Sequence, residues 1–166
     1  MEPTTAPYTT NFADSKETYQ AALLSLFAGK PENTEADLAK LFTPTFTQRD
    51  DHETRDFQAY VAHIRHMREM KVKVTLGMGP FLRDGSRLAE RHMSGTAGPD
   101  GFVRRSETFR FCEIAEDGRI QSIVETVAQG KEWRIGEYAQ AFGGWVARGR
   151  DRALNWAGLT WIEHEK

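Results

Sequence analysis

The chain has 166 residues, of which 39 % are hydrophobic and 28 % charged, and its formal net charge is −2. This length fits one domain with a sizeable core, and the interspersed acidic and basic residues argue against a nucleic-acid-binding surface. The longest apolar runs, such as AALLSLFA at residues 21–28, are too short to span a bilayer, so we expect neither a nucleic-acid nor a membrane partner.

The N-terminus and the cysteine content favour a cytoplasmic protein. Residues 1–14 lack the basic stretch and apolar core of a signal peptide, and we expect them to form a flexible arm. Cys112 is the only cysteine, so no disulfide can form within the chain, which fits a reducing compartment.

Helical spacing of apolar residues predicts three helices in the first half of the chain, at residues 15–28, 34–42 and 55–70. A residue that commonly caps helices opens each of them: Ser15, Thr34 and Asp56. The stretch TFTQRDD at residues 45–51 predicts a short strand that runs into a polar turn.

The second half changes to a period of two, which predicts strands at Lys71–Leu82, Arg87–Thr96, Val103–Ile114 and Arg119–Gln129. The turns between them contain Gly, Pro and Asp, as antiparallel hairpins require. Helices followed by such a run of strands indicate an α+β domain over residues 15–130, in which the helices pack on one face of a mostly antiparallel sheet.

Residues 131–166 form a distinct C-terminal extension that holds all four tryptophans of the chain. Side chains of this size are mostly buried, so the extension must dock on something. Three interpretations stay open: packing on the outside of its own domain, a contact in a dimer, and a lid over a pocket. We favour docking of Tyr138, Phe142 and Trp145 near a pocket entrance.

The strand SRLAERHMSGTAG at residues 86–98 lacks the clean apolar face of a half-buried strand. Alternation places four side chains on one face: Leu88, Glu90, His92 and Ser94. Either the sheet is exposed on both sides, or this face lines a cavity that uses an acid and an imidazole.

Four short motifs in order resemble the SnoaL-like branch of the nuclear transport factor two-like superfamily. They are SLFAGK, DLAKLFTPTF, LAERHMSGT and FRFCEIAEDGRIQSIVE, and the resemblance covers residues 16–129. It implies a cone-shaped fold, in which three N-terminal helices pack on a strongly curved sheet that encloses a pocket. In addition, WRIGEYAQAF at residues 133–142 is similar to the segment after the sheet in fungal scytalone dehydratases, which implies a lid but not their catalytic set.

The resemblance implies acid–base chemistry, because enzymes of this superfamily include polyketide cyclases, ketosteroid isomerases, dehydratases and epoxide hydrolases. Asp50 stands where the isomerases carry their general base, and Glu107 stands near their second acid. Glu125 lies on the last strand, where SnoaL-like cyclases commonly place an acid. The tyrosine of the isomerases' first helix has no counterpart, since the matching position is near Ala22.

We therefore predict a catalytic set of carboxyl and imidazole groups in an apolar pocket, consisting of Glu125, His92, Asp50 and Glu107. A carboxyl group in such a pocket has a raised pKa and can act as an acid or a base near neutral pH. The predicted substrate-binding residues are Tyr60, His63, Leu88, Glu90, Phe109, Phe111, Ile123 and Trp145. In this phase of the predicted strand at Val103–Ile114, Arg110 and Cys112 point outward.

Most of the candidates other than Glu125 also have a structural interpretation. Asp50 could belong to a solvated turn, and Glu107 could pair with an arginine across strands. Glu90 and His92 could lie in a salt-bridged outer surface. Tyr60 and His63 could be core and surface residues of the third helix.

We predict no cofactor and no metal. His63 and His66 could join His92 and Glu90 in a facial metal site, but the chain has no H-x-x-x-H or E-x-x-H pair. The predicted function is therefore that of a cofactor-independent isomerase, cyclase or dehydratase that acts on a hydrophobic, polyketide-like or terpenoid-like carbonyl compound in secondary metabolism. The alternative is a non-catalytic module of the same fold that binds a small ligand or dimerises. We expect a homodimer in either case.

Overall fold

The computed structural model describes residues 9–134. Its helical elements are η1 (Phe12–Asp14), α1 (Lys16–Ala28), η2 (Pro31–Asn33), α2 (Thr34–Ala39) and α3 (Phe57–Glu69). Its strands are β1 (Phe42–Arg49), β2 (Thr54–Asp56), β3 (Lys73–Asp84), β4 (Arg87–Ala97), β5 (Phe102–Ile114) and β6 (Ile120–Arg134).

The two long helices begin at the predicted caps. The Ser15 side chain accepts a hydrogen bond from the Thr18 backbone N–H, and the Asp56 side chain accepts one from Ala59. Each bond satisfies one of the donors that a helix leaves free at its N-terminus. The prediction for α2 was too long, because this helix ends at Ala39 and Phe42 is the fully buried first residue of β1.

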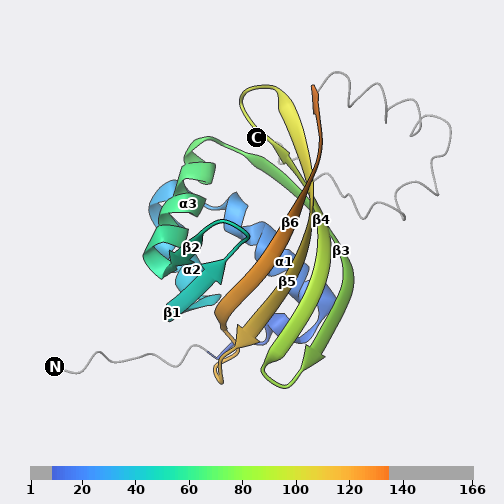
Figure 1. Cartoon of the computed structure of the whole chain (residues 1–166). Coiled ribbons are helices and arrows are strands. Elements are labelled where there is room, and N and C mark those ends of the chain that lie inside the picture. Colours follow the sequence, from blue (N-terminus) through green and yellow to red (C-terminus); the bar gives the residue numbers. More distant parts are fainter. Residues whose placement is uncertain (1–8, 135–166) are drawn as a thin grey trace.

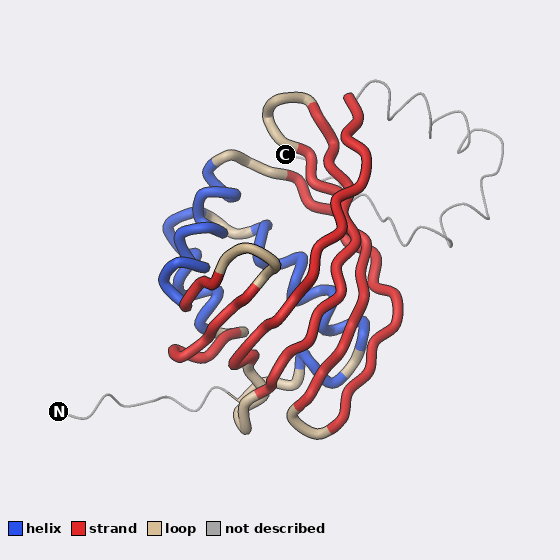
Figure 2. Tube along the Cα trace, in the orientation of Figure 1, coloured by secondary structure: helices blue, strands red, loops and turns tan. Residues whose placement is uncertain are grey.

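All six strands form one curved sheet in the order β2-β1-β6-β5-β4-β3 (Figure 1). The neighbours pair antiparallel except β1 and β6, which run parallel. Figure 2 shows the helices gathered on one side of this sheet. We call the side of the sheet that packs against the helices its inner face. The architecture is thus α+β with a mixed, mostly antiparallel sheet.

The boundaries at both ends differ from the predicted ones. Part of the predicted flexible arm packs on the domain: Phe12 and Ala13 are buried, and the Thr10 N–H donates to the Asp117 carbonyl at 2.8 Å. At the other end, β6 continues to Arg134, so the sheet includes the first four residues of the predicted extension. Residues 135–166, with Tyr138, Phe142 and Trp145, lie outside the described residues.

The core lies between the helices and the inner face. Three rings pack together at its centre, with Tyr60 of α3 lying 5.3 Å from Phe42 and 5.2 Å from Phe46, measured between ring centroids. Aromatic pairs at such distances add to the free energy gained by burying their area. None of the helices in residues 9–134 has the length and apolar character to cross a bilayer.

Candidate active site

Pairing across the sheet arranges the inner-face residues in rows. Residues directly opposite each other share a face, so each row is read from the strand register. The first row contains Phe81, Glu90, Arg110 and Glu125. The second contains Met78, His92, Thr108 and Val127. The third contains Leu76, Ser94, Ser106 and Gln129.

The structure corrects the predicted phase of β5. Phe109 and Phe111 were expected in the pocket, but they lie on the outer face and are 48 % and 65 % exposed. Arg110 and Cys112 were expected on the outer face, but both are buried on the inner one. The physical reason is the register of β5 with its neighbours, which places Arg110 opposite Glu90 of β4 and Glu125 of β6.

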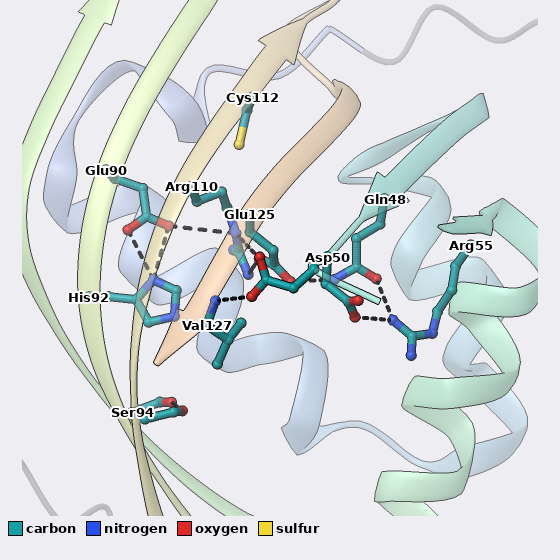
Figure 3. A network of polar contacts seen from close by, with 12 residues as sticks. Gln48, Asp50, Arg55, Glu90, His92, Ser94, Arg110, Cys112, Glu125 and Val127 are labelled. Carbon is teal, nitrogen blue, oxygen red and sulfur yellow. Dashed lines mark hydrogen bonds and ion pairs between the residues drawn. The ribbon is translucent and has the colours of Figure 1, made fainter. Parts of the chain in front are cut away.

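Glu90 and His92 of β4 are both buried, and Figure 3 shows the contact between their side chains. Nδ1 of His92 lies 3.0 Å from Oε1 and 2.9 Å from Oε2 of Glu90. An ionised carboxylate only accepts hydrogen bonds, so Nδ1 must carry the proton. Nε2, the other ring nitrogen, has no hydrogen-bond partner among residues 9–134, and in the neutral ring it keeps its lone pair.

Arg110 lies between the two buried acids of the first row. Its Nε and Nη2 donate to Oε2 of Glu125, both at 2.7 Å, while Nε lies 3.7 Å from Oε1 of Glu90. Burial alone would lower the pKa of Arg110, but its neighbours, Glu125 foremost, raise the pKa well above its ordinary value. Arg110 thus stays charged and holds both acids in place.

Gln48 of β1 completes the contacts of Glu125. Its Nε2 donates to Oε1 of Glu125 at 2.6 Å, and its own Oε1 accepts from Nη1 of Arg55 at 3.4 Å. The sequence prediction did not include Gln48. The signal was present, because alternation from buried Phe46 places Gln48 on the same face of the predicted short strand.

Asp50, the general base that the resemblance implied, lies in the loop after β1. Its carboxylate accepts from the backbone N–H groups of His52 and Glu53 at 2.9 and 2.8 Å, and from Arg55 at 3.0 Å. The His52 N–H contributes most to lowering the pKa of Asp50, and Arg55 and Glu53 add to it. Asp50 therefore caps the β1–β2 loop. This loop and Glu125 line a shallow hollow of about 420 Å³.

Glu107 lies outside the site. It projects from the outer face of β5 and pairs with Arg91 of β4, which also lies near the Phe109 ring. This is the cross-strand ion pair of the structural interpretation, and the prediction that Glu107 faces the pocket was wrong.

The two predicted residues of α3 differ in burial. Tyr60 belongs to the aromatic core, and burial raises its pKa to about 12. The Arg110 charge lowers this pKa and the Glu125 charge raises it, but burial has the larger effect. His63 is exposed, and its ring centroid lies 6.5 Å from that of Tyr60. Partial desolvation of the ring is the main cause that lowers the pKa of His63.

The other inner-face residues of the prediction are two core residues and a serine that contacts a second serine. Leu88 and Ile123 lie on the inner face and are almost fully buried beside Cys112. Ser94 is half-buried, and its hydroxyl lies 2.8 Å from that of Ser106. Trp145 lies outside the described residues.

Cys112 is a buried thiol of the core. Its Sγ lies 3.5 Å from the Tyr19 hydroxyl, and burial is the main cause that raises its pKa to about 11. A thiol with such a pKa is a poor nucleophile near neutral pH. Within residues 9–134, no three His, Cys, Asp or Glu side chains form a group that could hold a metal ion.

The structure resembles several solved structures in fold. An M. tuberculosis LEH-like epoxide hydrolase matches with a TM-score of 0.52 and 10 % identity, over 66 % of this chain and 81 % of that one. A candidate isomerase from Rhodopseudomonas palustris matches with a TM-score of 0.55 and 12 % identity, over 78 % and 98 % of the two chains. A nuclear transport factor two-like protein of unknown function from Exiguobacterium sp. 255-15 matches with a TM-score of 0.52 and 16 % identity, over 65 % and 96 %.

This chain has the nuclear transport factor two-like fold. No family model and no curated protein matches its sequence. The nuclear transport factor two-like fold was the fold that the sequence motifs implied. At these identities the likeness concerns the fold alone, and the function must be argued from the site.

Proposed function

We propose that this chain is a cofactor-independent acid–base enzyme, an isomerase, cyclase or dehydratase of the SnoaL-like kind, acting on an apolar carbonyl compound. The observation that carries the proposal is the buried Glu90–His92 pair, in which Glu90 holds Nδ1 and leaves Nε2 without a partner among residues 9–134. The activities named for the structural neighbours above, epoxide hydrolase and isomerase, agree with acid–base chemistry in this fold.

In the proposed reaction, Nε2 of His92 takes a proton from the carbon next to a carbonyl group, and the electron pair of the broken C–H bond moves into the enolate. The resulting imidazolium is stabilised by the Glu90 carboxylate. Return of the proton to another carbon gives an isomer, and its transfer to a departing hydroxyl group gives a dehydrated product and water. Arg110, Glu125 and Gln48 act as positioning residues, because they hold Glu90 in place.

The alternative, a non-catalytic module that binds a small ligand, is favoured by one observation. Arg110 and Gln48 both donate hydrogen bonds to the Glu125 carboxylate. Among the acid–base groups of the three rows, this leaves only Nε2 of His92 free to exchange a proton with a ligand. An enzyme with the proposed reaction needs this single group to do the work of both acid and base.

The experiment follows solvent deuterium entering 2-tetralone, an uncharged ketone with acidic α-protons, by ¹H NMR in D₂O buffer. The protein should accelerate exchange over an equal concentration of imidazole, and His92→Gln should lower the rate by about 10²–10⁴-fold, the usual effect of a positioned proton-transfer group. His66→Gln, at an exposed histidine of α3, is the matched control. Equal exchange rates for His92→Gln and the wild type would contradict the proposal.

We also propose that the protein is a homodimer that pairs through the outer face of the sheet. Among the side chains that the structure describes, five large apolar ones are exposed on this face: Leu82, Met93, Phe109, Phe111 and Val124. The Arg91–Glu107 pair lies among them. Apolar side chains beside charges of both signs suit a contact between two identical surfaces.

A further inference from the structure

The charges around His92 restrict what the proposed site can bind. Arg110 is the only cation in the three inner-face rows, and Glu125 and Glu90 already occupy it at 2.7 and 3.7 Å. Arg55, on the neighbouring β2, is paired with Asp50 and Glu53. Within the three rows, a ligand carboxylate or phosphate would therefore meet no free positive charge. The first row also carries one negative charge in excess, from two carboxylates and one guanidinium, and a neutral His92 in the second row does not offset it.

The two carboxylates are equally unavailable to a cationic ligand. The Glu90 side chain has no exposed surface, and both of its oxygens lie against His92. The Glu125 side chain is 7 % exposed, with one oxygen on Gln48 and the other on Arg110. An ammonium group would have to displace one of these contacts to reach a carboxylate oxygen.

The groups that remain are uncharged. Nε2 of His92 can accept a hydrogen bond, or donate one once it is protonated. In the next row, one hydroxyl of the Ser94–Ser106 pair donates to the other, which leaves the second hydroxyl with a proton to donate. These donors and acceptors match a hydroxyl or a carbonyl oxygen.

We infer that the site selects an uncharged compound whose polar end is a hydroxyl or carbonyl oxygen, and that it rejects carboxylates, phosphates and ammonium compounds. This inference rests on the proposed function, whose site it describes. It goes beyond the proposed function, which requires only an apolar carbonyl compound. The inference also excludes a carboxylic acid that carries the same apolar group.

Three probes with one aromatic body test the selection: 2-naphthalenemethanol, 2-naphthoate and 2-naphthylmethylammonium. Each is titrated at pH 7.5 into full-length protein with isotope-labelled histidine, and the His92 ring signals are followed by NMR and assigned with His92→Gln. The alcohol should shift these signals, with an affinity at least tenfold higher than that of either charged probe. Binding of 2-naphthoate as tight as that of the alcohol would overturn the inference, as would no His92 shift with the alcohol at its solubility limit.

Glu125→Gln should change the selectivity in a known direction. The variant removes one negative charge and leaves Arg110 with Glu90 alone, so the affinity for 2-naphthoate relative to the alcohol should rise at least tenfold. Asp84→Asn removes an exposed carboxylate in the β3–β4 hairpin and is the matched control. If a folded Glu125→Gln variant has the same ratio of affinities for 2-naphthoate and the alcohol as the wild type, the inference is contradicted. If the variant does not fold, the comparison of the three probes on the wild type remains the test.

A third variant tests the hydroxyl pair without changing charge. Ser94→Ala should weaken binding of the alcohol several-fold and leave rejection of the charged probes intact, and undiminished binding of the alcohol would contradict the assigned role of the pair. The deuterium-exchange assay separates the two proposals. Selective binding of the alcohol without exchange would end the proposed function and keep the inference, whereas exchange into an anionic ketone at the rate of 2-tetralone would end the inference alone.

Discussion

Glu90 and His92 contact each other although they are only two positions apart on β4, and both carboxylate oxygens of Glu90 lie within 3.0 Å of the same ring nitrogen. The contact is possible because alternate residues of a strand share a face. Both side chains are buried, so the fixed carboxylate determines which ring nitrogen carries the proton.

Removal of Arg110 should destabilise the protein strongly. Arg110→Met leaves the buried carboxylates of Glu90 and Glu125 without their shared cation, and breaking a buried pair in this way costs about 3–5 kcal/mol. Urea denaturation measures the loss of unfolding free energy. Arg91→Met is the matched control, because the Arg91–Glu107 pair is exposed, and it should cost less than about 1 kcal/mol. Similar losses for the two variants would contradict the assigned role of Arg110.

Cys112 should be almost unreactive in the folded protein. Its pKa of about 11 lies two units above the ordinary value of 9.0, so the thiolate fraction at pH 8 falls roughly 100-fold, and burial slows access further. Labelling with iodoacetamide, followed by mass spectrometry, should therefore be at least 100-fold slower in buffer than in 8 M urea. Equally fast labelling in the two solutions would place Cys112 on the surface.

The alternation in β4 grouped Leu88, Glu90 and His92 on one face, and the resemblance assigned this face to the inside. The structure places all three on the inner face, where they are buried. The phase of β5 was not predictable from its own residues, because both of its faces carry bulky groups. The length of the β4–β5 hairpin decides it: Ala97 pairs with Val103, and this register brings Arg110 opposite Glu90. A loop longer by one residue would have turned Phe109 and Phe111 inward.

Contacts between distant strands explain the other differences. Gln48 and Glu125 are 77 positions apart, and only the parallel pairing of β1 with β6 brings them together. The resemblance carried Asp50 over as a base by its place in the sequence. Its role as a loop cap follows from the turn that gives it two backbone N–H donors, which is a local geometry that the sequence alone left open.

Asp50 should contribute to stability in a pH-dependent way. Its folded-state pKa lies below the ordinary value, so its stabilising effect is present above about pH 4 and is lost as the pH falls through the folded-state pKa. Asp50→Asn should therefore be less stable than the wild type at pH 7, and the difference should shrink toward pH 2–3. Urea denaturation over this range measures it, with Asp84→Asn as the control. A difference that is constant with pH would contradict this role.

The outer face should mediate self-association. Phe111→Glu places a charge among the exposed apolar residues of the sheet, and it should weaken dimerisation at least tenfold while the melting temperature of the monomer stays near that of the wild type. Sedimentation velocity across micromolar concentrations measures the change. A wild-type protein that is monomeric at high micromolar concentration would refute the homodimer, and an unaffected dimer in Phe111→Glu would place its contact elsewhere.

The most direct measurement of the central claim is the protonation state of the two His92 ring nitrogens, since the proposed chemistry needs Nε2 free to accept a proton. Long-range ¹H–¹⁵N correlation spectra of ¹⁵N-histidine-labelled protein at pH 8, assigned with His92→Gln, distinguish the two neutral tautomers. The account predicts a protonated Nδ1 and an unprotonated Nε2 in the wild type, and loss of this single tautomer in Glu90→Gln. A proton on Nε2 with a bare Nδ1, or a Glu90→Gln spectrum identical to that of the wild type, would contradict it.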